Sequence, residues 1–330
     1  MDTRPAVADP WSVAADGALG AALNGCLEAA IAAPSIHNSQ PWRFAVRRGG
    51  VDLYADPGRR LAVVDPRGRE LAISVGAALL NLRVAVLAHG RVPVTRLLPD
   101  RAQPELVAQV RLGPPVNPDA TVQALARAIP ARRTNRRPFT RVTVPEEVLA
   151  ELITAAQAEG ATLTVVDNLA RDQLLGLARS ADRLLRHDPG YRAELTAWTG
   201  SCRLDGVPRA AFGPWDALET LPLRDFGLTR PDEPRRSAHF EARPTLVVLS
   251  TVDDTRERWL RAGQALERVL LTATVRGLAT TPLSQPLEVP RLRELLANGT
   301  GAPQVILRIG YGPASAASPR RPLSDVVSPG

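Results

Sequence analysis

The chain has 330 residues and a formal charge of +7, and 45% of its residues are hydrophobic although only 4% are aromatic. This composition predicts a folded core built mainly on Ala, Leu and Val, and argues against disorder as the main state. All 41 basic residues are arginine, which excludes a Walker A nucleotide site and any chemistry that needs a lysine Schiff base.

No signal in the sequence points to a membrane, to secretion or to nucleic acid. The first ten residues contain no apolar stretch typical of a secretory signal, and no run of eighteen apolar residues predicts a membrane span. Cys26 and Cys202, the two cysteines, form no CxxC motif, so we expect a cytoplasmic location. The arginines are spread along the chain without an aromatic-interleaved basic patch, so we expect no nucleic-acid partner.

The first motif follows an apolar helix predicted over residues 18–33. It reads Ala33-Pro34-Ser35-Ile36-His37-Asn38-Ser39-Gln40-Pro41-Trp42-Arg43-Phe44. Two prolines restrict the backbone of this loop, and five polar side chains lie between them. The amides of Asn38 and Gln40 offer donors and acceptors that suit the alternating polar edge of a flavin ring. A turn that only satisfies its own backbone is the alternative interpretation.

Two segments further along the chain resemble each other. Residues 74–90 and 261–277 are both predicted to be small-residue helices, each followed by an apolar strand that ends in glycine. The spacing of the glycines is the same in both helices: Gly76 and Gly90, Gly263 and Gly277. The repeated order predicts an internal duplication, and the nearly continuous apolar positions place both helices at the centre.

We place the boundary between the two halves around Pro130, after a proline-rich loop, and assign residues 1–125 and 126–330 to them. The second half begins with a predicted helix over residues 145–159 and a strand over residues 161–166. Residues 199–244 have no counterpart in the first half and are rich in Pro, Gly and Arg. We expect this segment to be a lid with a few packed aromatic residues, with disorder as the alternative.

The second motif is Ala131-Arg132-Arg133-Thr134-Asn135-Arg136-Arg137-Pro138-Phe139. Four guanidinium groups and a hydroxyl in one short segment suit a phosphate dianion, because arginine forms paired, charge-assisted hydrogen bonds with it. A solvated run of charge is the alternative interpretation. A third arginine group, Arg320-Arg321-Pro322-Leu323, lies near the C-terminus.

Together these motifs resemble the nitroreductase family of FMN flavoproteins, and most of all its long actinobacterial branch typified by the Acg proteins. The resemblance spans nearly the whole chain, and the loop from Pro34 to Trp42 is its most specific element. It implies an α+β fold of the nitroreductase type, in which two fused modules form an internal pseudo-dimer. Each module would be an antiparallel sheet flanked by helices.

The resemblance also implies one FMN site shared by the two halves, because the loop motif and the arginine motif each occur once. The arginine motif would contact the phosphate and ribityl chain through Arg132, Thr134 and Arg136, with Arg133 nearby, and the C-terminal contact would come from Arg320 and Arg321. The loop would lie along the flavin through Pro34, Ser35, Asn38 and Gln40. Leu283 and Ser284 fall where the family's loop approaches the flavin ring.

Two functions remain open on this resemblance. The first is an oxidoreductase that takes electrons from NAD(P)H and passes them to a small-molecule acceptor, a nitro compound or a quinone. The second is a protein that stores or sequesters FMN beneath the lid. We expect a monomer, with a homodimer as the alternative.

A hydrolase using Ser35 and His37 is excluded, because the sequence lacks a G-x-S-x-G elbow around either residue. The four histidines, of which His37 is one, show no metal-binding spacing, and we assign them to surface or structural positions.

Overall fold

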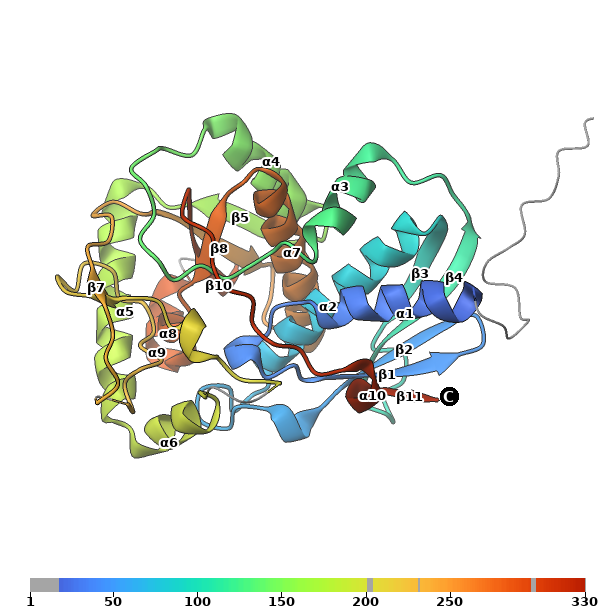
Figure 1. Ribbon diagram of the computed structural model, residues 1–330, viewed down its shortest axis with the longest axis horizontal. Coiled ribbons are helices and arrows are strands. Elements are labelled where there is room, and N and C mark those ends of the chain that lie inside the picture. Colours follow the sequence, from blue (N-terminus) through green and yellow to red (C-terminus); the bar gives the residue numbers. More distant parts are fainter. Residues whose placement is uncertain (1–17, 201–203, 231, 298–300, 330) are drawn as a thin grey trace, which may run out of the picture.

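The computed structural model describes residues 18–200, 204–230, 232–297 and 301–329; Cys202 lies outside these ranges. The two larger sheets lie toward opposite ends of the molecule, and helices pack between and around them (Figure 1). This arrangement confirms the predicted α+β class.

The first sheet has the strand order β11-β1-β2-β4-β3. Its strands are β1 (Trp42–Arg47), β2 (Gly50–Ala55), β3 (Arg91–Leu97), β4 (Leu106–Pro115) and β11 (Val327–Pro329). A two-residue turn with Gly49 at a φ of +74° joins β1 to β2, a conformation that favours glycine. The sheet differs from the predicted antiparallel one at its edge, because β11 pairs in parallel with β1.

The second sheet is antiparallel throughout and has the strand order β5-β8-β10-β9. Its strands are β5 (Thr162–Val165), β8 (Thr245–Thr251), β9 (Ala279–Pro282) and β10 (Ala302–Gly310). The chain then leaves β10 and runs back to the first sheet, where it ends in β11 (red in Figure 1). The end of the second half therefore completes the sheet of the first half.

The helices that the structure describes range from four to twenty residues. They are α1 (Ala18–Ile31), α2 (Arg69–Ala88), α3 (Ala120–Ala128), α4 (Glu146–Gln157), α5 (Asn168–His187), α6 (Pro189–Ala197), α7 (Arg256–Val275), α8 (Gln285–Glu288), α9 (Pro290–Leu296) and α10 (Leu323–Val326). Asp119, Asp167 and Asp188 cap α3, α5 and α6 by accepting a hydrogen bond from a free backbone N–H. The predicted helices over residues 18–33 and 145–159 correspond to α1 and α4.

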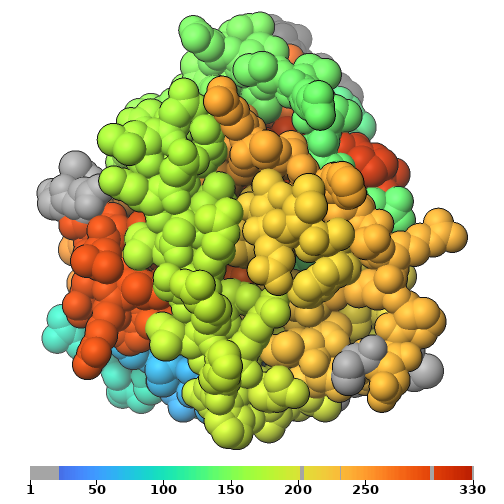
Figure 2. All heavy atoms as spheres, turned by 90° about the vertical axis from the view of Figure 1, so that its left-hand side faces the viewer, coloured from blue at the N-terminus to red at the C-terminus, as the bar shows by residue number. Residues whose placement is uncertain are grey.

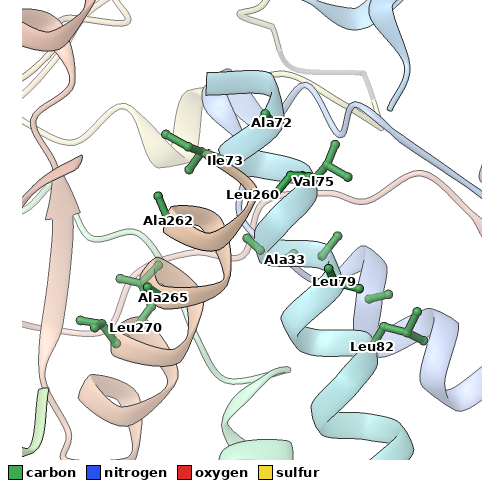
Figure 3. Close-up of a cluster of buried hydrophobic side chains, with 14 of the residues drawn as sticks. Ala33, Ala72, Ile73, Val75, Leu79, Leu82, Leu260, Ala262, Ala265 and Leu270 are labelled. Atoms are coloured by element: carbon green, nitrogen blue, oxygen red, sulfur yellow. The ribbon is translucent and has the colours of Figure 1, made fainter. Parts of the chain in front are cut away.

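The repeated helices α2 and α7 cross at the centre of the molecule (Figure 3). Their equivalent glycines meet there: a Cβ on Gly76 would lie 3.0 Å from the Cα of Gly263 and 2.2 Å from the carbonyl oxygen of Leu260. Around this point Val75, Leu79 and Leu82 of α2 and the apolar side chains of α7 form one buried cluster. The crossing is thus close enough to exclude any side chain at these two positions. Whether the halves arose by duplication stays a prediction.

Helix α2 is the one described helix that is long and apolar enough to span a membrane, and 83% of its apolar window is buried inside the fold. Its burial follows from its position, because α1, α3, α7 and the first sheet surround it. Its apolar character is therefore explained by the core of this protein.

We call the described residues 204–230 and 232–244 the covering segment. It contains a 3-10 turn, η3 (Arg209–Ala211), and two short paired strands, β6 (Trp215–Asp216) and β7 (Ser237–Ala238). Together with α5 and α6 it makes up much of the face seen in Figure 2. Phe212 and Phe226 are buried in a cluster with residues of α5 and α6. The segment thus has its own packed side chains.

Candidate functional site

The loop between α1 and β1 has an unusual backbone. His37, Asn38 and Gln40 all have left-handed φ angles, between +47° and +54°. Residues other than glycine rarely adopt this conformation unless their surroundings impose it, at a cost of about 1 kcal/mol or more each. The hydrogen bonds of the loop supply that constraint.

The amide of Asn38 joins three segments that are far apart in sequence. Its Nδ2 donates to the carbonyl oxygens of Gly206 in the covering segment, at 2.9 Å, and of Pro319 in the C-terminal segment, at 3.0 Å. Its Oδ1 accepts from Arg320 at 3.0 Å. The side chain is therefore occupied in positioning the loop.

Gln40 has a similar role behind the loop. Its Nε2 donates to the carbonyl oxygen of Leu204 at 2.9 Å, and its Oε1 accepts from the backbone N–H of Arg321 at 2.8 Å. Its own backbone N–H donates to Ser35 Oγ at 2.9 Å. Gln40 is fully buried and lines neither of the cavities described below.

The arginine motif is held against strand β9. Thr134 forms a bridge with Thr280, and the backbone N–H of Asn135 donates to the carbonyl oxygen of Thr280 at 2.9 Å. Thr281 Oγ1 donates to the carbonyl oxygen of Asn135. These contacts bring the motif of the second half next to the loop of the first half.

A cavity of about 220 Å³, which we call the arginine cavity, lies where the two motifs meet. Eight residues that the sequence singled out line it: Pro34, Ser35, Asn38, Arg132, Arg133, Thr134, Arg136 and Arg320. Arg321 lies outside it, and its guanidinium donates to the carbonyl oxygen of Asp325 at 2.8 Å.

The arginines of this cavity differ in how many donors they have free. Arg133 donates through Nη1 to the carbonyl oxygens of Pro130 and Arg132, and no carboxylate of the described residues pairs with it. Arg136 donates through Nη1 to the carbonyl oxygen of Ala211, and its guanidinium lies 4.6 Å from the centre of the Phe226 ring. Burial lowers the pKa of Arg136 to about 10, and it remains charged at neutral pH.

Arg320 is mostly committed to the chain itself. Its two terminal nitrogens donate to Asn38 Oδ1 and to four carbonyl oxygens, among them those of Ala32 and Ala33 at 3.0 Å. Burial, followed by the charge of Arg132, lowers its pKa to about 9. It therefore contributes positive charge to the cavity but mainly anchors the end of α1.

A second cavity, the central cavity, has a volume of about 120 Å³ and adjoins the first. The two share four lining residues: Pro34, Ser35, Thr134 and Arg136. The walls of the central cavity come from α2, α7, β9, α8, β10 and the covering segment, and include Ile73, Leu266, Leu270, Ser284, Val305, Leu307 and Phe226. Leu283 points elsewhere: its side chain is fully buried beside Leu246 and Ile306 and lines neither cavity.

His37 belongs to the central cavity, although the sequence placed it at a surface or structural position. It is 6% exposed, its ring packs edge-on against Phe226 with centroids 5.2 Å apart, and neither ring nitrogen has a hydrogen-bond partner among the described residues. Burial, with Arg224 and Arg136 nearby, lowers its pKa well below the usual value, so the ring is neutral. A neutral imidazole with a free donor and a free acceptor suits a polar ligand group. Only the fold brings this ring into the cavity.

The covering segment is joined to the floor of the central cavity by a buried ion pair. Arg224 donates to the carboxylate of Glu288 in α8, to Tyr191 Oη at 2.7 Å and to Ser284 Oγ at 3.1 Å. Glu70 of α2 also lines the cavity, and burial raises its pKa to about 7. The cavity thus combines apolar walls with a few charged and polar groups.

Comparison with known proteins gives relatives over nearly the whole chain. The model of the nitroreductase family matches residues 207–311. Rv3131 of Mycobacterium tuberculosis, provisionally named an NAD(P)H nitroreductase, is 36% identical over 91% of this chain and 89% of its own. The protein Acg of the same organism, with the same provisional name, is 32% identical over 92% of this chain and 94% of its own.

Solved structures are more distant. The FMN-dependent nitroreductase NfnB from Mycobacterium smegmatis, in complex with NADPH, is 22% identical, with a TM-score of 0.39 over 62% of this chain and 97% of its own. A nitroreductase with bound FMN from Desulfitobacterium hafniense has the same TM-score and coverage at 14% identity.

Proposed function

The chain belongs to the nitroreductase family, as its motifs indicated, and on that premise we propose that it is an FMN-dependent oxidoreductase. It would take electrons from NAD(P)H and pass them to a nitro compound or a quinone. One FMN per chain would lie across the two cavities, with its phosphate in the arginine cavity and its ring in the central cavity. The names of the relatives and of the distant structures are consistent with this cofactor and electron donor.

One observation carries the proposal: the two cavities adjoin and share Pro34, Ser35, Thr134 and Arg136. A cationic compartment thus continues into a mainly apolar one, which matches a phosphate ester joined to a flat aromatic ring. Arg132 and Arg133 would hold the phosphate, because both residues line this cavity and each guanidinium keeps donors that no described residue accepts. The hydroxyls of Ser35 and Thr134 would contact the chain between phosphate and ring.

When bound, FMN supplies reversible hydride transfer. The protein positions the cofactor, excludes water from it and provides charged groups beside it. Leu223 and Phe226 of the covering segment line the central cavity, and their apolar side chains would keep water out of it. Arg136, which is partly buried and lines both cavities, would stabilise negative charge that develops on a ligand there. His37 would donate or accept one hydrogen bond at the ring or at the second substrate.

The proposal is tested by changing Arg132 and Arg136 together to alanine. We expect FMN to bind at least about 100-fold more weakly, because a charge-assisted contact of Arg132 with the phosphate and the positive charge of Arg136 between the cavities are both lost. The matched control is Arg137→Ala, which removes an exposed arginine of the same motif that lines neither cavity. Flavin absorbance after gel filtration measures retention. If the double variant keeps stoichiometric flavin, the phosphate site lies elsewhere.

A storage or sequestration function is the second candidate, and the ion pair between Arg224 and Glu288 favours it. This buried pair keeps the covering segment over the central cavity, where a nicotinamide would have to stack. Anaerobic mixing with NADPH and with NADH separates the two functions. Rapid bleaching of the flavin supports the oxidoreductase; flavin that stays yellow with both but bleaches with dithionite supports sequestration.

We further propose that a single chain forms the whole site and acts as its own pseudo-dimer in the cytoplasm. Support comes from the arginine cavity, which residues of both halves line. Light scattering of the flavin-loaded protein gives the mass, and one FMN per monomeric chain is expected. A homodimer with one FMN for two chains would contradict this assembly.

A further inference from the structure

Helix α7 places a carboxyl group directly behind the arginine cavity. Glu267 is fully buried, and its Oε1 lies 3.5 Å from Nε of Arg132, which lines the cavity. The function proposed above does not use this carboxyl group. In its charged form this carboxylate would oppose the binding of an anion in the arginine cavity.

The surroundings of Glu267 come from three other parts of the chain. Arg132 faces it from the arginine motif, Arg320 from the C-terminal segment and the amide of Asn81 from α2, while the charge of Arg133 acts on Arg132. Burial raises the pKa of Glu267 to about 7, and Arg132, Asn81 and Arg320 oppose this rise. Near neutral pH the group is therefore poised between its charged and neutral forms.

We propose that Glu267 couples the binding of a phosphate ester in the arginine cavity to the uptake of one proton. The phosphate and the carboxylate compete for the guanidinium of Arg132, which lies between them. When the phosphate binds, the carboxylate is left beside a second anion in a buried site, and a proton from solvent then adds to it. This inference rests on the proposed function, because it takes FMN as the phosphate ester.

The direction of the pH dependence follows from this exchange. Below about pH 7 the carboxyl group of the free protein already holds its proton, so binding requires no uptake. Above about pH 7 the free protein has lost that proton and must regain it, so affinity falls by up to about tenfold for each pH unit. The phosphate itself, with a second pKa of about 6, is already a dianion in this range.

The experiment measures the dissociation constant of FMN between about pH 6.5 and 8.5 by quenching of flavin fluorescence. For the unmodified protein we expect the constant to rise about tenfold over the last pH unit. For Glu267→Gln, which mimics the neutral acid, we expect a change of less than about twofold. Riboflavin, which lacks the phosphate, should show no such rise with either protein.

Glu159→Gln is the matched control. Glu159 is another buried carboxylate that contacts α2 and α7, but it pairs with Arg83 and Arg268 and lines neither cavity. This variant should keep the full pH dependence. If Glu267→Gln does not fold, calorimetry of the unmodified protein near pH 8.5, in buffers of different ionisation enthalpy, gives the number of protons taken up directly. We expect close to one.

Two results overturn the inference in different ways. FMN binding without proton uptake, or with the same alkaline weakening in Glu267→Gln, contradicts the role of Glu267 and leaves the flavin site in place. Absence of FMN binding by the unmodified protein at every pH contradicts the proposed function, and the inference falls with it.

Discussion

The central helix pair and the covering segment differ in what holds them in place. Where α2 and α7 cross, backbone lies against backbone at Gly76 and Gly263, and the surrounding side chains are apolar. The covering segment has one short pair of strands, and arginines add to the packing of its buried aromatic side chains. Arg235 pairs with Asp225 and donates to the carbonyl oxygen of Gly213 at 2.8 Å, and Arg224 pairs with Glu288.

This difference shows which part of the site is rigid. The crossing supplies Ile73, Leu266 and Leu270 to the central cavity, and a close-packed crossing has one arrangement. The covering segment supplies Leu223, Arg224 and Phe226, and it is also held by partly exposed side-chain contacts such as that of Arg235 with Asp225, which open more readily than a packed core. We therefore expect the covering segment to open as a local unit while the helix pair stays closed. The helix pair also contains two carboxyl groups that oppose folding when they are charged: Glu70 on α2 is mostly buried and Glu267 on α7 is fully buried.

The largest expected effect is on the pH dependence of stability, and it comes from the buried carboxyl group of Glu267. Burial raises the pKa of Glu267 from 4.5 to about 7, so the folded protein without ligand binds more protons than the unfolded chain between these values. Its contribution to the free energy of unfolding therefore falls as the pH rises, by about 3 kcal/mol between pH 4.5 and 7. Urea denaturation between pH 4.5 and 7 measures the free energy of unfolding, which should fall less with rising pH for Glu267→Gln than for the unmodified protein. Equal slopes for the two proteins would show that Glu267 is ionised throughout.

Gly263→Ala should lower the free energy of unfolding by about 2 kcal/mol, because its Cβ would lie 2.0 Å from the carbonyl oxygen of Ile73. Gly176→Ala is the control: this glycine lies inside α5, and no atom lies within 4 Å of an added Cβ. There we expect a gain of about 0.5 kcal/mol or more. Denaturant midpoints measure both, and equal effects would mean that the crossing tolerates side chains.

Arg235→Ala should have the smallest effect on global stability, about 1 kcal/mol or less, because the side chain is partly exposed. Its local effect should be clear, since it removes the contacts with Asp225 and Gly213. Hydrogen exchange of the covering segment should become faster while the amides of α2 and α7 keep their protection. Faster exchange in both regions would show that they unfold together.

Much of the fold could be predicted from local patterns. The apolar helices, the strands over residues 106–113 and 305–310 and the two equivalent glycines were readable because helix periodicity, strand alternation and terminal glycines act over short distances. The parallel edge strand β11 was not predicted, since three residues with no turn before them carry no local signal. The covering segment was recognised by its lack of a counterpart, but its packed partners were not.

Part of the candidate site could also be predicted from the sequence. Both motifs line one cavity, as their residue types suggested, whereas Gln40, Leu283 and Arg321 lie outside both cavities. Gln40 was singled out because its amide could bond the polar edge of a flavin ring. The same amide can bond two backbone groups instead, as it does here, and the residues next to Gln40 in the sequence do not indicate which partners it has. For the same reason His37 and Glu267 could not be found, since burial and partners decide their chemistry.

The sequence by itself determined the family, the α+β class and the two motifs, because these depend on residue types at fixed spacing along the chain. The tertiary structure decided which side chains face a cavity and which face the backbone. It also decided that a carboxyl group of α7 stands behind Arg132. Such outcomes depend on contacts between residues far apart in sequence, such as the pair of Arg132 and Glu267, and on the loss of water around them.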